Sequence, residues 1–170
     1  MAQLRIEHVE AAFACGVVGP IGVLVWRGEP TRECLERAMW AFDHATSDIA
    51  PCLGMLSVIE AGSPPPSPVH LPMLARRFDG LEHLCATVGV LEDRGPLARL
   101  LVDVASTIFV LRTRRGQPMK LCAGLEEGVA WLTRKLEPVA DATLRRDALE
   151  LVQHLRDELT RVGAASSPAL

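Results

Sequence analysis

The chain has 170 residues, of which 49% are hydrophobic and 23% charged, and its formal net charge is −3. That length suits one domain with a substantial core, and the small negative charge gives no overall attraction to nucleic acid or to an anionic membrane. No apolar run reaches the roughly 18 residues that a membrane helix requires, and the charged N-terminus is unlike a secretory signal. We therefore expect a cytoplasmic protein that neither binds nucleic acid nor inserts into a membrane.

The first part of the chain predicts strands followed by a helix. Apolar segments on either side of "GPIG" predict a hairpin of Phe13–Val18 with Val23–Arg27, and a further strand is expected near Leu4–Val9. Thr31 then suits the N-cap of a helix. Trp40 lies off the apolar stripe of that helix, which makes it a candidate for an exposed contact residue.

Two short apolar runs in the middle of the chain, Cys52–Ile59 and His83–Asp93, are typical of strands that are covered on both faces. Between them, "VIEAGSPPPSP" leads into a helix that Ser67 caps and Gly80 ends. Because proline fixes φ and stiffens the chain, we interpret this stretch as a rigid corner inside one domain. Another helix is predicted over Leu97–Ile108.

The last third predicts short strands near Val110–Arg112 and Met119–Ala123, then a helix that Pro138 interrupts. A long amphipathic helix is expected over 138–163, followed by a disordered tail at 164–170. An apolar stripe runs along this helix through Leu144, Ala148, Leu151, Leu155, Leu159 and Val162. The stripe must be buried, either on the protein's own sheet or against the same helix of a second chain or another partner.

The resulting order is β-β-α-β-α-β-α-β-α with one long terminal helix. Alternating strands and helices predict crossover connections and parallel pairing, whereas the opening hairpin adds antiparallel pairing. We expect an α/β fold with a mixed sheet, helices mainly on one face, a main domain over 1–137 and the separate C-terminal helix.

The five cysteines are scattered and form no CxxC pair. Most of them lie in apolar runs, so we expect reduced, buried thiols that act as small hydrophobic side chains. Neither their spacing nor that of the five histidines indicates a metal site.

Four segments carry a resemblance to a known family: "VWRGEPT" at 25–31, "LSVIEAGSPPPSP" at 56–68, "ATVGVLEDRG" at 86–95 and "LEEGVAWL" at 125–132. Together they resemble STAS-like domains of the SpoIIAA type, a fold grouped with the lipid-binding CRAL-TRIO domains, and most closely small STAS-like proteins of myxobacteria. The resemblance implies a curved sheet with helices mainly on one face and a regulatory or scaffolding role. The region after Pro138 lies outside it.

The anti-sigma-factor antagonists of this fold are controlled by phosphorylation of a serine at the start of the helix after the third strand. This chain has Ser63 and Ser67 in the corresponding neighbourhood, without the Asp-Ser-Ser motif of the antagonists. A phosphate on Ser67 would be stabilised by the N-terminus of a helix. The alternative is that Ser67 is an ordinary N-cap, which stabilises a helix by about 1 kcal/mol.

A basic group of side chains is a second candidate, for a phosphate-bearing ligand or an acidic partner surface. It consists of Arg94, Arg112, Arg114, Arg115 and Lys120. The alternative is a solvated loop. Glu60, Glu92 and Asp93 end predicted strands, where a catalytic carboxylate can lie, but such groups are usually solvated. No nucleophile elbow, P-loop or dinucleotide-binding motif accompanies them.

We therefore expect no catalytic residues and no cofactor. The leading hypothesis is a non-catalytic regulatory or scaffolding protein that acts by protein–protein interaction and forms a homodimer. Exposed Trp40 and Trp131, together with the terminal helix, would supply the interface. A small-molecule or lipid-binding module is the alternative, and a hydrolase using Glu60 and Glu92 is the least supported reading.

Overall fold

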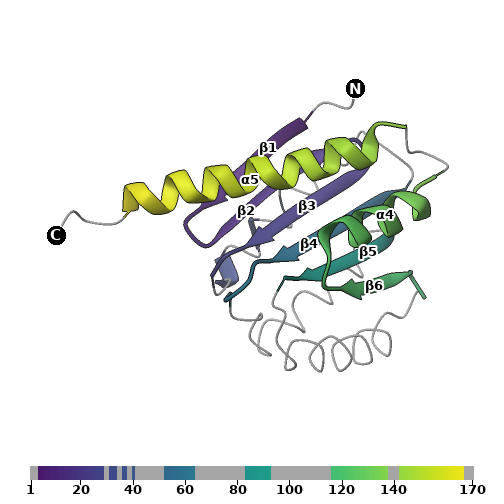
Figure 1. Cartoon of the computed structure of the whole chain (residues 1–170), viewed down its shortest axis with the longest axis horizontal. Coiled ribbons are helices and arrows are strands. Elements are labelled where there is room, and N and C mark those ends of the chain that lie inside the picture. Colours follow the sequence, from purple (N-terminus) through teal and green to yellow (C-terminus); the bar gives the residue numbers. More distant parts are fainter. Residues whose placement is uncertain are drawn as a thin grey trace.

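The computed structural model describes residues 4–28, 31–33, 36–37, 40, 52–63, 83–92, 116–137 and 142–166. These residues include a six-stranded sheet and two long helices (Figure 1). No helix among them is long and apolar enough to cross a membrane. The helices expected around 67–80 and 97–108, and the strand near 110–112, fall outside the described residues.

The strands follow one another across the sheet in chain order. They are β1 (Leu4–Glu10), β2 (Phe13–Val18), β3 (Ile21–Trp26), β4 (Leu53–Ile59), β5 (Leu84–Leu91) and β6 (Met119–Cys122). β1, β2 and β3 pair antiparallel, and β3 to β6 pair parallel. The predicted mixed α/β sheet, with a hairpin followed by parallel crossovers, is confirmed.

The hairpin between β2 and β3 is tighter than the sequence predicted. Val18 pairs directly with Ile21, so only Gly19 and Pro20 form the turn. Gly19 has φ of +50°, a conformation that glycine adopts without steric cost and that two-residue hairpin turns require. As a result, β3 begins at Ile21 and ends before Arg27, which leaves the Arg27 side chain at the end of the strand.

Both described helices lie on the same face of the sheet (Figure 1). α4 (Leu125–Lys135) packs on β4, β5 and β6, and α5 (Leu144–Ser166) packs on β1, β2 and β3. The C-terminal turns of α5 extend beyond the strands. The predicted C-terminal helix is confirmed. It continues to Ser166 and so includes three residues that were expected to be disordered, whereas 167–170 are outside the described residues.

The apolar stripe of α5 is buried inside the protein. The following residues of the stripe are at most 1% exposed: Leu144, Ala148, Leu151, Leu155 and Leu159. They form one hydrophobic core with the inward-facing residues of β2 to β5 and of α4. The stripe therefore packs on the protein's own sheet, which is the first of the two alternatives. The proposal that these five side chains form an intermolecular interface is wrong. Val162, the last residue of the stripe, is half-buried.

Two glycines let α4 approach the sheet closely. A Cβ atom on Gly54 of β4 would lie 2.6 Å from Leu136 Cδ1, and one on Gly128 of α4 would lie 2.8 Å from Val90 Cγ2. Real Cβ atoms essentially never come that close, so a side chain here would force its neighbours to shift. The interface between α4 and the sheet is consequently close-packed, with Leu132 and Leu136 fully buried.

The opposite face of the sheet is also covered, because every residue of β2 and β3 is buried. On this face the rings of Phe13 and Trp26 lie 4.4 Å apart between centroids. The indole Nε1 of Trp26 donates a hydrogen bond to Ser57 Oγ at 2.9 Å. This bond satisfies the indole donor inside the protein.

Candidate functional site

Charged side chains gather where three parallel strands end. Arg27, Glu60 and Glu92 follow β3, β4 and β5 directly. Because parallel strands have their carboxyl ends at the same edge of the sheet, the three side chains meet there. In open α/β sheets this edge is the usual place for a ligand site, which makes it the first candidate for function.

Arginines hold both glutamates. Arg27 donates from Nε to Glu60 Oε2 at 2.6 Å and from Nη2 to Glu60 Oε1 at 3.2 Å, a two-pronged contact. Arg156 of α5 donates from Nη2 to Glu92 Oε1 at 2.6 Å. The Nε atom of Arg156 also lies 3.3 Å from Glu60 Oε1. We call Arg27, Glu60, Glu92 and Arg156 the carboxyl-end cluster.

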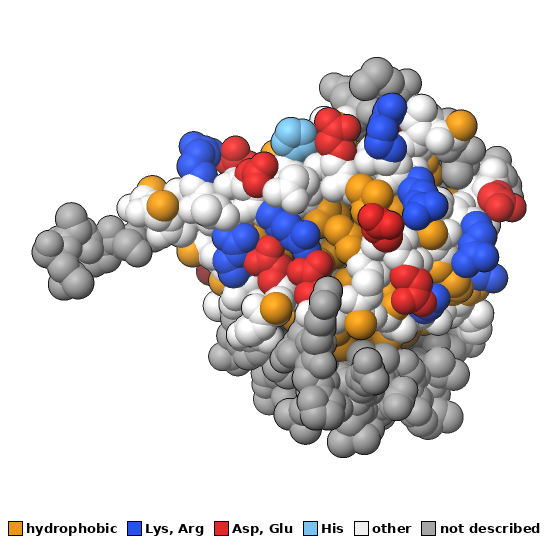
Figure 2. Space-filling view, in the orientation of Figure 1, with side chains coloured by type: hydrophobic (Ala, Val, Ile, Leu, Met, Phe, Trp, Pro, Cys, Tyr) orange, Lys and Arg blue, Asp and Glu red, His pale blue; other side chains and the backbone are white. Residues whose placement is uncertain are grey.

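The carboxyl-end cluster fastens α5 to the sheet. Arg27 Nη1 donates to Thr160 Oγ1 at 3.0 Å, and Arg27 Nη2 donates to the backbone oxygen of Arg156 at 3.4 Å. Figure 2 shows basic and acidic side chains side by side below α5. The cluster thus joins the ends of three strands to one helix.

The electrostatics of the carboxyl-end cluster favour a structural role. Its two guanidinium and two carboxylate groups sum to no charge, and each side chain is only partly exposed. The hydrogen bond to Glu60 and the charge of Glu60 raise the pKa of Arg27, although partial desolvation opposes this. Arg27 therefore stays protonated, and Glu60 and Glu92 are held as ion-pair acceptors. Each of the two carboxyl groups thus has a guanidinium partner.

One nitrogen in the carboxyl-end cluster lacks a hydrogen bond. Arg156 Nε is buried and has no hydrogen-bond partner, although Glu60 Oε1 is within ion-pairing distance. The side chain of Arg156 as a whole is 21% exposed. Its terminal Nη2 donates a hydrogen bond to Glu92, so Arg156 is hydrogen-bonded to Glu92 and ion-paired with Glu60.

Only two residues of the predicted phosphate-related sites lie in the described part of the chain. Ser63 Oγ donates to the backbone oxygen of Trp26 at 3.2 Å, so its hydroxyl helps to fix the turn after β4. Lys120 in β6 is paired with Glu127 at 2.6 Å. Ser67, Arg94, Arg112, Arg114 and Arg115 are outside the described residues, so their grouping stays a prediction.

The two candidate tryptophans differ in exposure. Trp40 is 62% exposed. Trp131 is half-buried against the core, and the Nζ atom of Lys135 lies 5.7 Å from its ring centroid, within range of a cation–π contact. Exposure therefore supports Trp40 as a contact residue more than Trp131.

Ion pairs lie along the helical residues before Trp40. Residues 32–33, 36–37 and 40 are helical, directly after Thr31, as the predicted N-cap requires. Arg37 pairs with Glu33 at 2.6 Å and with Glu10 of β1 at 2.9 Å. Arg32 pairs with Glu36 at 2.9 Å. Because residues three and four apart are neighbours on a helix, Glu36 and Arg37 lie one turn before the exposed Trp40.

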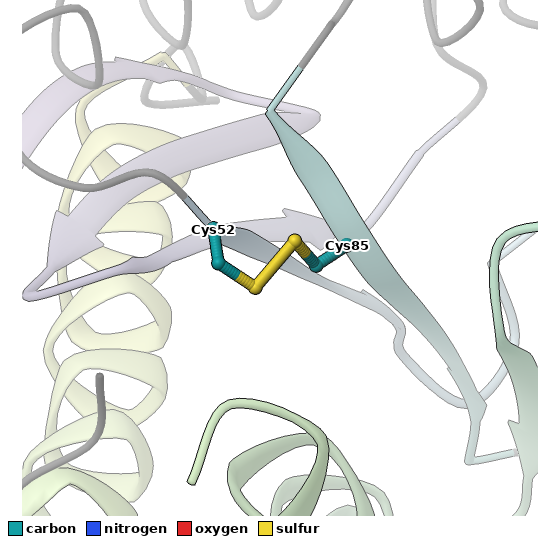
Figure 3. The surroundings of a disulfide bond; sticks show 2 residues. All are labelled: Cys52 and Cys85. Atoms are coloured by element: carbon teal, nitrogen blue, oxygen red, sulfur yellow. A yellow bond between two sulfur atoms is a disulfide. The ribbon is translucent and has the colours of Figure 1, made fainter. Parts of the chain in front are cut away.

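The cysteines differ from the sequence expectation. Cys52 and Cys85 form a disulfide between the beginnings of β4 and β5 (Figure 3), so the prediction of reduced thiols is wrong for this pair. Cys15 and Cys122 are free and buried, as expected. Desolvation is the main cause that raises the pKa of Cys15, to about 12, and it also raises the pKa of Cys122.

Within the described residues, no group of three or more His, Cys, Asp or Glu side chains is placed to hold a metal ion. Comparison with known protein families, with curated proteins and with solved structures finds no match for the chain.

Sequence reasoning found Glu60 and Glu92 but missed the two arginines and Thr160. The sequence feature that could have identified Arg27 is its position directly after an apolar strand, the same position that Glu60 and Glu92 have after theirs. Arg156 lies on the polar side of an amphipathic helix, 64 residues from Glu92. No local pattern connects the two.

Proposed function

We propose that the protein is a non-catalytic regulatory or scaffolding module of the STAS-like type, and that it associates with a second copy of itself through the surface around Trp40. The observation that carries the proposal is the 62% exposure of a tryptophan that follows ion-paired side chains along the same helical residues. Exposed aromatic side chains beside arginine are characteristic of interface centres.

The state of the strand-end carboxylates supports a non-catalytic role. Glu60 and Glu92 were the carboxylates considered for hydrolysis, and both accept short contacts from arginine. A general acid or base must exchange its proton during the reaction. Two carboxylates neutralised by guanidinium groups that also anchor α5 are poorly suited to that task.

The charges around Trp40 suit pairing with an identical surface. A two-fold interface places a patch against itself, so a patch of one sign would repel its copy. The helical residues before Trp40 include Arg32 and Arg37 together with Glu33 and Glu36. Because both signs alternate along the helical residues, a rotated copy can set arginine against glutamate.

The alternative of a ligand between sheet and helices finds less support. In the described part of the chain, this layer is filled by side chains with almost no exposure. There is not even room for a Cβ atom on Gly54 or Gly128 without a shift of the neighbouring side chains. A lipid or small molecule on this face would have to displace part of the core.

The proposal is tested by light scattering after size exclusion at several concentrations, on the wild type and on Trp40→Ala. We expect the wild type to approach twice the monomer mass at high concentration, and the variant to remain near the monomer mass. Removal of a central interface tryptophan typically weakens binding by at least about 2 kcal/mol, or roughly thirtyfold in Kd.

Ile6→Ala is the matched control. Among the described residues, Ile6 and Trp40 are the exposed large hydrophobic side chains. Ile6 pairs with Gly16, which faces Leu151 of α5, so Ile6 lies on the α5 side of edge strand β1. Ile6→Ala should dimerise like the wild type. Loss of the dimer in Ile6→Ala but not in Trp40→Ala would move the interface to β1 and overturn the proposal.

A further inference from the structure

The disulfide occupies a special position in the sheet. Leu53 pairs with Leu84, and the next residue of β4, Gly54, pairs with Ala86. Cys85 is thus the extra residue of β5 at a shift in register and has no partner in β4. An extra residue in a strand turns the local side chains away from their regular direction. Here the shift lies next to Cys52, at the beginning of β4.

The positions of the two cysteines suit a bond. Their Cα atoms are 5.4 Å apart, near the middle of the range for disulfides. The bond joins residues 33 apart in the sequence and closes a ring that contains β4, the connection after it and the first residue of β5. Oxidation therefore constrains the whole connection between two central strands.

The four described cysteines form two classes. Cys52 and Cys85 are both half-buried, so each has a solvent-accessible part. Cys15 and Cys122 are buried, and desolvation raises the pKa of each thiol. Thiol exchange needs access and a thiolate. A small reagent can thus reach the pair while the other two thiols stay protected.

Contacts other than the disulfide also hold β4 against β5. Backbone pairing continues from Gly54 to Ile59 along β5, and Leu53 N donates to His83 O at 2.7 Å beside the cysteines. α4 also packs on both strands. Reduction consequently removes the ring closure but leaves the contacts that hold β4 against β5.

We propose that Cys52 and Cys85 form a reversible redox switch that opens and closes the ring between β4 and β5. In the opening reaction, one thiolate of an external dithiol attacks a sulfur of the disulfide and forms a mixed disulfide, releasing the other cysteine as a thiolate that takes up a proton. The second thiol of the reagent then loses its proton and displaces the remaining cysteine. Two electrons pass to the protein, Cys52 and Cys85 become thiols, and the dithiol becomes a cyclic disulfide.

The test is differential alkylation of the folded full-length protein, read by peptide mass spectrometry before and after dithiothreitol. Without reductant, Cys52 and Cys85 should not react with iodoacetamide. After reduction of the native protein, both should react, while Cys15 and Cys122 stay unmodified until denaturant is added. Alkylation of Cys52 and Cys85 without reductant, or no alkylation after native reduction, would overturn the proposal.

Thermal unfolding gives a second readout. Reduction should lower the Tm by about 10 °C, the shift expected from losing a ring of this size in a chain of this length. The unfolding transition should stay cooperative. Cys52→Ser with Cys85→Ser should have the lower Tm in both conditions. A wild-type Tm that does not respond to dithiothreitol, or a reduced protein that is unfolded at room temperature, would contradict a reversible switch.

Discussion

The two ends of the central strands β4 and β5 are fastened by different chemistry. At the carboxyl end, Glu60 and Glu92 are joined through Arg156 of α5. At the amino end, Cys52 and Cys85 join the same two strands covalently. Ion pairs respond to salt and exchange quickly with water, whereas a disulfide responds to reductant alone. The same pair of strands is thus sensitive to two independent conditions, one at each end.

The ion pairs and the disulfide contribute less to the stability of the fold than the hydrophobic core does. Partly exposed ion pairs contribute about 1 kcal/mol each or less, and a disulfide that closes this ring contributes about 3 kcal/mol. The core beneath α5 and α4 contains many fully buried aliphatic side chains, each of which contributes about 1.5–3 kcal/mol. Both fastenings therefore act on a sheet that the core already stabilises. Variants can rank the contributions of the core, the disulfide and the ion pairs to stability.

The largest effect is expected from shortening a core side chain of α5. Leu155 is fully buried in the core, next to exposed His154. Leu155→Ala should lower the free energy of unfolding by about 4 kcal/mol, because it removes apolar contact and leaves a cavity. Urea unfolding measures this. His154→Ala is the control and should change stability by less than about 0.5 kcal/mol. Equal effects would mean that α5 does not depend on its buried stripe.

Removing the disulfide should have the second-largest effect. The double replacement Cys52→Ser and Cys85→Ser should cost about 3 kcal/mol of unfolding free energy under oxidising conditions, since the unfolded chain gains the freedom of an open ring. Urea unfolding with and without reductant measures the loss. In reductant, variant and wild type should coincide. A difference that persists there would show that the serines disturb the native packing instead.

At the carboxyl end, Arg156→Ala should lower the free energy of unfolding by about 1–2 kcal/mol, because it leaves two partly buried carboxylates next to a single arginine. The loss should shrink as salt is raised from low to high concentration in urea unfolding. Arg161→Ala is the comparison variant, because Arg161 is exposed and pairs only locally with Glu158. If both variants behave alike, the carboxyl-end cluster does not fasten α5.

A smaller effect is expected at alkaline pH from buried Cys15, on the face opposite α5. Burial raises the pKa of its thiol from 9.0 to about 12, so the folded state favours the neutral form. The stability that the fold gains from the neutral thiol is complete below pH 9 and is lost as the pH rises toward 12. Between pH 9 and 10, the free energy of unfolding of the wild type should fall by about 1 kcal/mol more than that of Cys15→Ala. Parallel pH profiles in urea unfolding would show instead that water reaches this thiol.

Local patterns predicted most of the sheet but not the contacts between distant residues. β4 and β5 were predicted because each is a continuous apolar run. The stripe of α5 was predicted from its spacing, but spacing does not determine what covers an apolar face. The two fastenings depend on which strands are neighbours: Cys85 reaches Cys52 only because β5 pairs with β4 with a shift in register. Arg27 likewise meets Glu60 only because β3 pairs with β4, and Arg156 reaches Glu60 only after α5 has folded back over the sheet.

Sedimentation velocity of the wild-type protein across concentrations tests the proposed function most directly. We expect a reversible monomer–dimer equilibrium, with a weight-average sedimentation coefficient that rises toward the dimer value at about 10–100 µM, a range typical of modest interfaces. The rise should disappear in Trp40→Ala, which should sediment as a monomer throughout. A wild-type protein that sediments as a monomer at every concentration would contradict self-association through Trp40.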